Sequence, residues 1–442
     1  MSRRIRAVHG AFGLLRGVSR REISRPPRSS ASHQSPTHEP DVSTYPSRPW
    51  IPPAIAGALL TLWSCASAPE QVEQRPFFPA PPDPPRVQFL RSIEAVEDVE
   101  PPRSGLDNLV FGDAKVERRA IRRPFGCAYR DGMVYVADSQ GSQILRVDFK
   151  NRKMGPVPLE GRAAMQSPLG LCFSPEGLAY VTDPQRKQVV VLDKDFKWVA
   201  EFGPLGPKTR PVDVKAHEDQ LYVTDAGEAC VWVLERKTGK VLRKLGNQDK
   251  AEETLRGPTF VSIDPNGYAY VVDTIYSRVT VWDKDGKYIR QIGEPGDIVG
   301  TLARPKGIAW SEDNTIYVLD GAFENCQIFD LAGNPLMFFG GPGNGPGSLY
   351  LPGTVWIGRG KEGLDLFQDL IDPDFDAERL ILVTSQYGPR KLNAYAFGKS
   401  RKFEYKAVAL PSVPQPAPPR KESQPSGKDA KGTPQPASAT RK

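Results

Sequence analysis

The chain has 442 residues, of which 39% are hydrophobic, and it contains 44 prolines and 40 glycines. Its formal net charge is +7, but residues 1–64 carry nine Lys and Arg against three Asp and Glu, and residues 411–442 carry six against two. The net charge of residues 65–410 is therefore −3, which argues against a nucleic-acid partner for the folded part of the chain.

Residues 1–64 are predicted to be a leader. The apolar run AIAGALLTLWS before Cys65 is too short to span a bilayer, which takes about 20 apolar residues, and its length suits a secretory signal. Leu62, Ser64 and Cys65 resemble a bacterial lipobox, although Trp63 departs from the usual small or β-branched residue. This resemblance implies that Cys65 is lipidated and becomes the mature N-terminus. Plain secretion and an ordinary buried cysteine are the alternatives.

The segment ahead of the apolar run is unusually long and rich in arginine. One hypothesis is that translation starts near Val42, which would give a signal of normal length; a transit peptide is the rival, since the first 30 residues contain one acidic residue, Glu22. Residues 65–85 are predicted to be a proline-rich linker after the anchor cysteine, and residues 411–442 a disordered tail. The domain between them is expected to span residues 86–410.

A unit that begins at a proline recurs six times in this domain. The prolines stand 43 to 47 residues apart, and each precedes a short alternating run such as GCAYR or FVSID, a turn, and a second run that ends in YVAD or a close variant in the first five units. The six prolines are Pro124, Pro168, Pro211, Pro258, Pro305 and Pro352.

Two acidic residues ten positions apart mark five of the six units. Two more alternating runs follow the first acid, so each unit has four runs of period two bounded by turn residues, which predicts four antiparallel strands. Four-stranded units of this length are the blades of a propeller, and the fold is predicted to be an all-β, six-bladed β-propeller. The pairs are Asp138 with Asp148, Asp183 with Asp193, Asp225 with Glu235, Asp273 with Asp283, and Asp320 with Asp330.

The ring needs a strand that joins its two ends. PRVQFLRSI (85–93) is similar to the fourth strands and precedes the first blade as they precede the others, so we expect it to pair onto the last blade and cover its edge. KFEYKAV (402–408) follows the third run of the sixth unit and is the alternative.

The fourth unit, with Arg278 five residues after Asp273, closely resembles the NHL repeat. The leader cysteine, the linker, the repeats and the stretch FDAERLILVTSQYGPRKLNAYAFG together resemble a group of bacterial six-bladed propeller lipoproteins. Such proteins are often encoded beside multihaem c-type cytochromes and envelope electron-transfer components. The resemblance therefore implies envelope proteins, among them multihaem cytochromes, as partners.

Metal chemistry has few candidate ligands in this sequence. Three of the four histidines lie in the leader, and His217 stands alone in a polar turn, where a surface position is expected, so a zinc lyase is disfavoured. None of the five cysteines forms a C-x-x-C pair. Cys127, Cys172, Cys230 and Cys326 are predicted to be buried free thiols, with a Cys127–Cys172 disulfide as the alternative.

An acidic insertion distinguishes the sixth unit. DPDFDAE (372–378) begins like a calcium loop, but Ala377 replaces the required glycine, so an EF-hand is excluded and only an irregular Ca²⁺ site is left. A short helix is predicted around residues 364–371. The insertion is the candidate partner-contact surface, comprising Asp365, Asp369, Asp372, Asp374, Asp376 and Glu378.

The repeated aspartates pose a choice between a site and a fold determinant. Asp138, Asp183, Asp225, Asp273 and Asp320 could ring the channel as a cation site, or each could cap a turn by accepting backbone N–H bonds. Recurrence in five units favours the structural role, because a chemical site usually singles out one or two blades.

The sequence supports an exported, lipid-anchored propeller that serves as a binding or scaffold module in a bacterial envelope, at the outer membrane because Ala66 follows Cys65. No catalytic residue is assigned and no cofactor is expected. The alternative is a calcium-dependent lactonase or hydrolase of the same fold. Carboxylates converging from several blades would favour the enzyme, and a channel lined by small and apolar residues would favour the scaffold.

Overall fold

The computed structural model describes residues 75–101, 120–246 and 249–405. The chain divides into two units, residues 1–70 and 71–442, and every described residue belongs to the second. Cys65, the proposed start at Val42 and the tail 411–442 lie outside the described residues. Within the described ranges no helix has the length and apolar character needed to cross a membrane.

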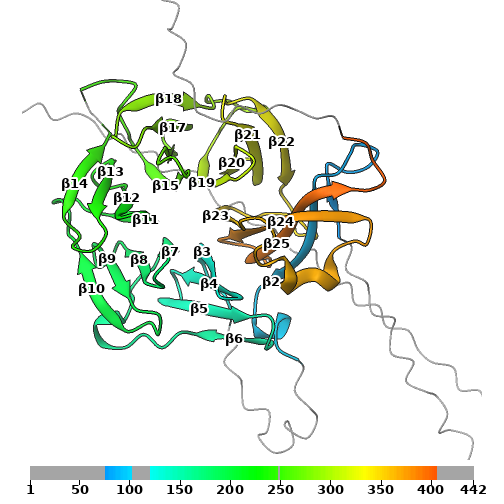
Figure 1. Cartoon of the computed structure of the whole chain (residues 1–442), viewed down its shortest axis with the longest axis horizontal. Helices are drawn as coiled ribbons and strands as arrows, with labels where there is room; N and C mark the ends of the chain where they lie inside the picture. Colours follow the sequence, from blue (N-terminus) through cyan, green and yellow to red (C-terminus); the bar gives the residue numbers. More distant parts are fainter. Residues whose placement is uncertain (1–74, 102–119, 247–248, 406–442) are drawn as a thin grey trace, which may run out of the picture. The chain divides into compact units, whose positions relative to one another are not determined.

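The described part of the second unit folds into six β-sheets arranged as the blades of a propeller (Figure 1). The first strand of each blade lies nearest the centre and the fourth lies at the rim. The first three blades consist of β3 (Pro124–Arg130), β4 (Met133–Asp138), β5 (Gln143–Asp148) and β6 (Lys153–Pro156); β7 (Leu171–Phe173), β8 (Ala179–Asp183), β9 (Gln188–Leu192) and β10 (Trp198–Phe202); and β11 (Pro211–His217), β12 (Gln220–Asp225), β13 (Cys230–Glu235) and β14 (Val241–Leu245).

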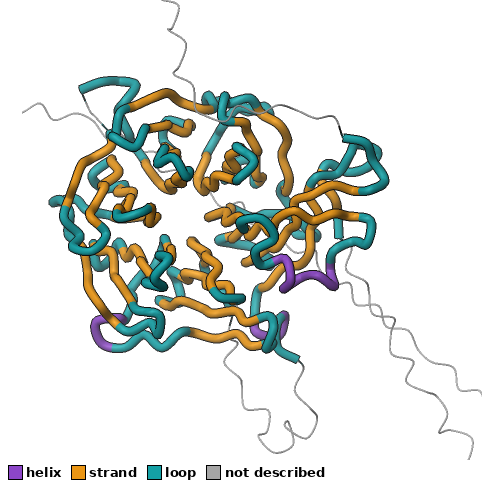
Figure 2. Tube along the Cα trace, in the orientation of Figure 1, coloured by secondary structure: helices purple, strands orange, loops and turns teal. Residues whose placement is uncertain are grey.

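Blades four and five repeat the same antiparallel order. They consist of β15 (Pro258–Ile263), β16 (Ala269–Asp273), β17 (Arg278–Trp282) and β18 (Tyr288–Ile292), and of β19 (Pro305–Ser311), β20 (Thr315–Asp320), β21 (Asn325–Asp330) and β22 (Pro335–Gly340). Short 3-10 helices interrupt the strands at η1 (Val96–Asp98), η2 (Gly161–Ala163) and η3 (Leu364–Leu370) (Figure 2).

The sixth blade is closed by the N-terminal part of the domain, as predicted. It contains β23 (Pro352–Ile357), β24 (Phe375–Ser385) and β25 (Leu392–Ser400), and its fourth strand is β2 (Val87–Ile93), which pairs antiparallel with β25. A fifth strand, β1 (Phe77–Phe78), extends this sheet outward from within the predicted linker. The alternative closing segment is not a strand over its described residues 402–405.

Apolar side chains from neighbouring sheets fill the space between them. Among the described residues there are six hydrophobic clusters, one at each junction, including the junction between blades six and one. A lone blade would expose the apolar side chains on both faces of its sheet to water, so each blade depends on its two neighbours. The ring therefore closes through packing as well as through the pairing of β2 with β25.

Candidate functional site

A pocket of about 530 Å³ opens where the first strands end around the channel. All six blades contribute to its lining, and the contributing segments are residues 127–129, 171–173, 215–217, 262–265, 308–312 and 355–359. Because the first strands converge on the centre, residues that are far apart in the sequence meet here. We take this channel-mouth pocket as the candidate site.

Lys215, which lines the pocket, forms an ion pair with the buried Asp213. The amine of Lys215 lies 3.0 Å from each carboxylate oxygen of Asp213, which also accepts the N–H of Val261 at 3.2 Å. Burial alone would lower the pKa of Lys215, but neighbouring groups, foremost the charge and hydrogen bonds of Asp213, together raise it above its ordinary value. Lys215 is therefore a stable cation at neutral pH, and its side chain is 30% exposed whereas that of Asp213 is 1% exposed.

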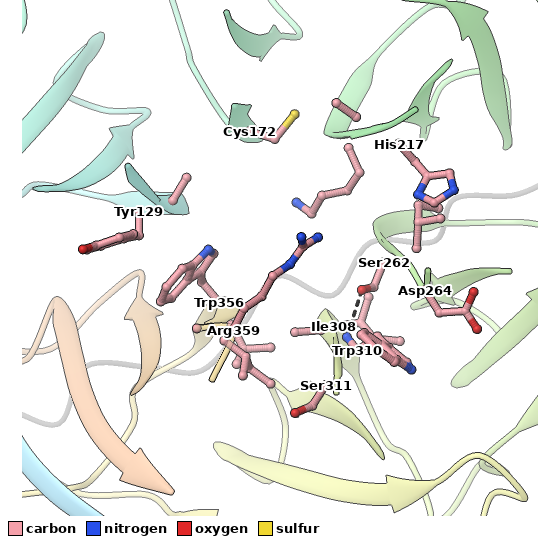
Figure 3. Close-up of a pocket in the computed structure, with 18 of the residues that line it drawn as sticks. Tyr129, Cys172, His217, Ser262, Asp264, Ile308, Trp310, Ser311, Trp356 and Arg359 are labelled. Carbon is pink, nitrogen blue, oxygen red and sulfur yellow. Dashed lines mark hydrogen bonds between the residues drawn. The ribbon is translucent and has the colours of Figure 1, made fainter. Parts of the chain in front are cut away.

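Arg359 reaches into the centre of the pocket from the loop after β23 (Figure 3). Its backbone is fixed on both sides: Glu362 accepts the N–H of Arg359 at 3.2 Å, and Glu312 of blade five accepts the N–H of Gly360 at 2.9 Å. Among the contacts of the described residues, none gives the Arg359 guanidinium a carboxylate or carbonyl acceptor. The loop thus holds a cation over the channel that the protein itself does not neutralise.

Aromatic rings line the sides of the pocket. Tyr129 and Trp356 pack with ring centroids 5.4 Å apart, and Trp310 lies on the opposite side of Arg359 (Figure 3). The backbone N–H of Trp310 donates to the Ser262 hydroxyl at 2.9 Å, and this bond joins the first strands of blades five and four. The aromatic part of the wall is therefore held by contacts between blades, and polar residues complete the lining.

The remaining titratable groups of the pocket are held by the protein. The Asp264 carboxylate accepts the N–H groups of Asn266 and Tyr268, both at 2.9 Å, within its own turn. His217 ends β11, directly before the exposed turn at residues 218 and 219, and its partly exposed side chain lines the pocket. Burial raises the pKa of both Cys127 and Cys172 to about 12, which keeps these thiols protonated.

All four cysteines of the described residues are buried and free, as predicted, and the alternative disulfide is absent there. In the same ranges no group of three or more His, Cys, Asp or Glu residues is placed to hold a metal ion. Within these ranges, neither the carboxylates of residues 372–378 nor those near the channel form such a group.

The repeated aspartates are fully buried and accept backbone N–H bonds inside their own blades. In each, the residue before the blade's proline donates to the carboxylate at 2.8–3.1 Å, and the turn after the second strand donates again. In four of these blades the proline, which has no N–H, lies directly opposite the aspartate. These contacts are those of a turn cap. The pre-proline donors are Arg123, Ser167, Arg210, Gly257 and Arg304.

The acidic insertion of blade six packs against the closing strand. Gln88 on β2 donates to the carbonyl of Leu370 at 3.2 Å and accepts the N–H of Asp372 at 3.1 Å. The rings of Phe77 and Phe375 lie 5.5 Å apart. The insertion, which contains the predicted short helix as η3, therefore helps to attach the N-terminal strands to the ring.

The predicted partner surface is partly neutralised by basic residues at the end of β25 and just after it. Asp374 forms an ion pair with Lys402 at 2.7 Å, Asp376 pairs with Arg401, and Glu378 lies 3.9 Å from Lys399. Asp372 accepts the N–H of Asp374. The exposed residues Asp365 and Asp369 lie on η3 and form no ion pair among the described residues.

Arg359, Trp310 and Trp356 were not singled out from the sequence. They stand at or just after the ends of first strands, where the six units differ, whereas the repeat positions are nearly constant. Variation at a fixed place in the repeat was the available signal, but it does not say that these ends face one another across a channel.

Comparisons with known proteins extend no further than the fold. No family model matches the chain. No curated protein matches it either. Among solved structures, a protein of unknown function from Bacteroides thetaiotaomicron is similar at 15% identity and a TM-score of 0.48, covering 70% of this chain and 75% of that one.

Two further solved structures are similar to this chain. A streptogramin B lyase is similar at 13% identity and a TM-score of 0.45, covering 63% of this chain and 85% of that one. A chain of a nidogen/laminin complex is similar at 17% identity and a TM-score of 0.41, covering 57% and 92%. At these scores the similarities carry no argument about activity, and the propeller architecture rests on the strand pairing described above.

Proposed function

We propose that this chain is an exported, lipid-anchored propeller that serves as a protein-binding or scaffold module in the bacterial envelope. Export and the lipid anchor at Cys65 rest on the sequence of the leader. A place in an electron-transfer assembly beside multihaem cytochromes rests on the resemblance to propeller lipoproteins. The function proposed for the folded part is binding without chemistry on the bound partner.

The observation that supports binding over catalysis is the state of the channel carboxylates. Asp213 is neutralised by Lys215, and Asp264 is bound by the backbone of its own turn. A metal-dependent hydrolase needs carboxylates that converge and keep free oxygens for an ion. The pocket wall instead combines the aromatic residues Trp310 and Trp356 with the cations Lys215 and Arg359, a mixture that suits a contact surface.

Partner capture tests the scaffold role. The full chain, with a C-terminal affinity tag, would be cross-linked in a bacterial host, purified from membranes and its partners identified by mass spectrometry. We expect specific envelope proteins with the wild type, and a several-fold loss with Asp365→Asn/Asp369→Asn because their exposed charges lie on the candidate surface. Asp131→Asn/Asp285→Asn removes two exposed carboxylates from other blades and should leave recovery unchanged.

Recovery of no envelope protein, together with a metal-dependent esterase activity, would overturn this proposal and favour the hydrolase. The anchor is tested separately by Cys65→Ser. This variant should move from the membrane fraction to the soluble fraction, and an unchanged distribution would contradict lipidation at Cys65.

A further inference from the structure

The guanidinium of Arg359, at the centre of the channel-mouth pocket, has no acceptor among the described residues. Arg359 points into the pocket, and its planar guanidinium has five N–H donors that suit two oxygens of one anionic group (Figure 3). Lys215 uses two contacts on Asp213, so the ammonium retains one further donor on its exposed side.

The nearest acidic side chains do not compete for this place. Asp264 is 2% exposed and its carboxylate points away from the centre of the pocket (Figure 3). Glu312 is bound to the N–H of Gly360 and thereby positions the arginine loop. The loop is therefore built to present Arg359 without neutralising it.

The shape of the pocket adds a requirement for a flat apolar body. Trp356 and Trp310 lie on opposite sides of the arginine, with Tyr129 beyond Trp356, and a volume of about 530 Å³ falls in the range of small-molecule sites. Aromatic walls favour a planar ring, and the arginine favours a carboxylate attached to it.

We propose that the channel-mouth pocket binds a small aromatic carboxylate, with Arg359 and Lys215 holding the carboxylate and the aromatic walls holding the ring. This goes beyond the scaffold role and does not depend on it. The protein contributes recognition only, and no bond of the ligand changes. Regular blades one and five supply Tyr129 and Trp310, and the irregular sixth blade supplies both Trp356 and the arginine.

Calorimetric titration of the full chain with phenylacetate tests the proposal. We expect a Kd of about 1 mM or below, the range for a ligand of this size in a formed pocket. Phenylacetamide keeps the ring and shape but lacks the charge, and acetate keeps the charge but lacks the ring. Each should bind at least about tenfold more weakly, because one of the two halves of the site is then unused.

Variants assign the binding to this place. Arg359→Ala should weaken phenylacetate binding at least about tenfold, and Arg359→Lys should keep part of it because the charge is retained without the fork. Lys361→Ala removes an exposed cation two residues away, outside the pocket lining, and should leave the Kd unchanged. Both substitutions are at an exposed loop position, so the variants are expected to fold as the wild type does, which circular dichroism checks.

Equal binding of phenylacetate and phenylacetamide would overturn the proposal, and so would wild-type affinity in Arg359→Ala. The absence of any heat or ligand-observed NMR signal for phenylacetate would overturn it as well. Failure of this test would leave partner capture by the acidic surface untouched, because the two experiments depend on different residues.

Discussion

Blade four and blade six use different means to reach the same sheet. In blade four, Asp273 accepts the N–H groups of Arg256 and Gly257 at 3.0 and 2.9 Å and so ties the start of the first strand to the end of the second. In blade six, Ser385 stands opposite Pro352, and the N–H of Leu351 donates to Glu324 of blade five instead.

This difference distinguishes the contacts that stabilise every blade from those that close the ring, which are made in blade six alone. Every blade must fix its first strand against its second, and the repeat encodes this locally. Only one blade must receive the N-terminal strand, and only blade six carries the insertion that contacts that strand and the arginine that enters the pocket. The irregular blade thus holds both the closure and the distinctive side chain of the site.

Removing the closing strand of blade six should have the largest effect on the stability of the domain. Val87, Phe89, Leu90 and Ile93 are all 0% exposed, so removing residues 1–94 exposes their packing partners and the edge of β25. We expect loss of the cooperative thermal transition measured by circular dichroism. A chain that begins at residue 75 keeps β1 and β2 and should unfold as the full chain does. A cooperative transition in the chain that lacks residues 1–94 would show that closure does not depend on β2.

Asp273→Ala should destabilise the domain by about 2–4 kcal/mol, because the buried N–H of Gly257 and the partly buried N–H of Arg256 lose their carboxylate acceptor. Ser385→Ala is the matched change in blade six and should cost about 1 kcal/mol, since the serine hydroxyl accepts longer bonds from Tyr350 and Asn393, at 3.3 and 3.4 Å. Urea unfolding of both variants measures the difference. Equal costs would mean that the repeated aspartate has no special part in the regular blades.

Lys306 distinguishes blade five from its regular neighbours. It lies at the start of β19, and burial together with Arg304 and Arg123 lowers its pKa from 10.5 to about 8. The unfolded chain therefore binds an extra proton between pH 8 and 10.5, and this group makes stability rise with pH across that window. Below pH 8 it is charged in both states and its cost is constant.

Lys306→Met should accordingly stabilise the domain by about 1–3 kcal/mol below pH 8, after allowance for partial exposure, with the gain falling towards pH 10.5. Urea unfolding of wild type and variant at pH 7 and pH 10 measures both values. A gain that does not change with pH would contradict a lowered lysine pKa.

The ion pairs of the insertion should matter least. The hydrogen bond from Arg401 lowers the pKa of Asp376, so this pair stabilises the fold above the ordinary pKa of aspartate and loses its effect as pH falls through the lowered value. The pair is exposed, so Asp376→Asn should change the thermal midpoint at pH 7 very little. A large drop at pH 7 would instead assign the insertion a stabilising role equal to that of the closing strand.

Much of the fold was predictable because its determinants are local. Prolines without an N–H, the aspartates opposite them and the alternation of side chains recur at fixed spacing, and these set the strands, the blades and their number. The closing strand was also predictable, since PRVQFLRSI repeats the pattern of a fourth strand. The pocket was less predictable, because nothing in the repeat marked Arg359 or placed His217 in its lining.

The sequence by itself determined the five regular blades, because the turn cap and the strand pairing of each involve residues of a single repeat unit. Only the tertiary structure decided which residues meet across the channel and which blade supplies the unpaired cation. The physical reason is that Lys215, Trp310 and Arg359 share no local contact. They are brought together by the closure of the ring, which depends on packing between all six blades at once.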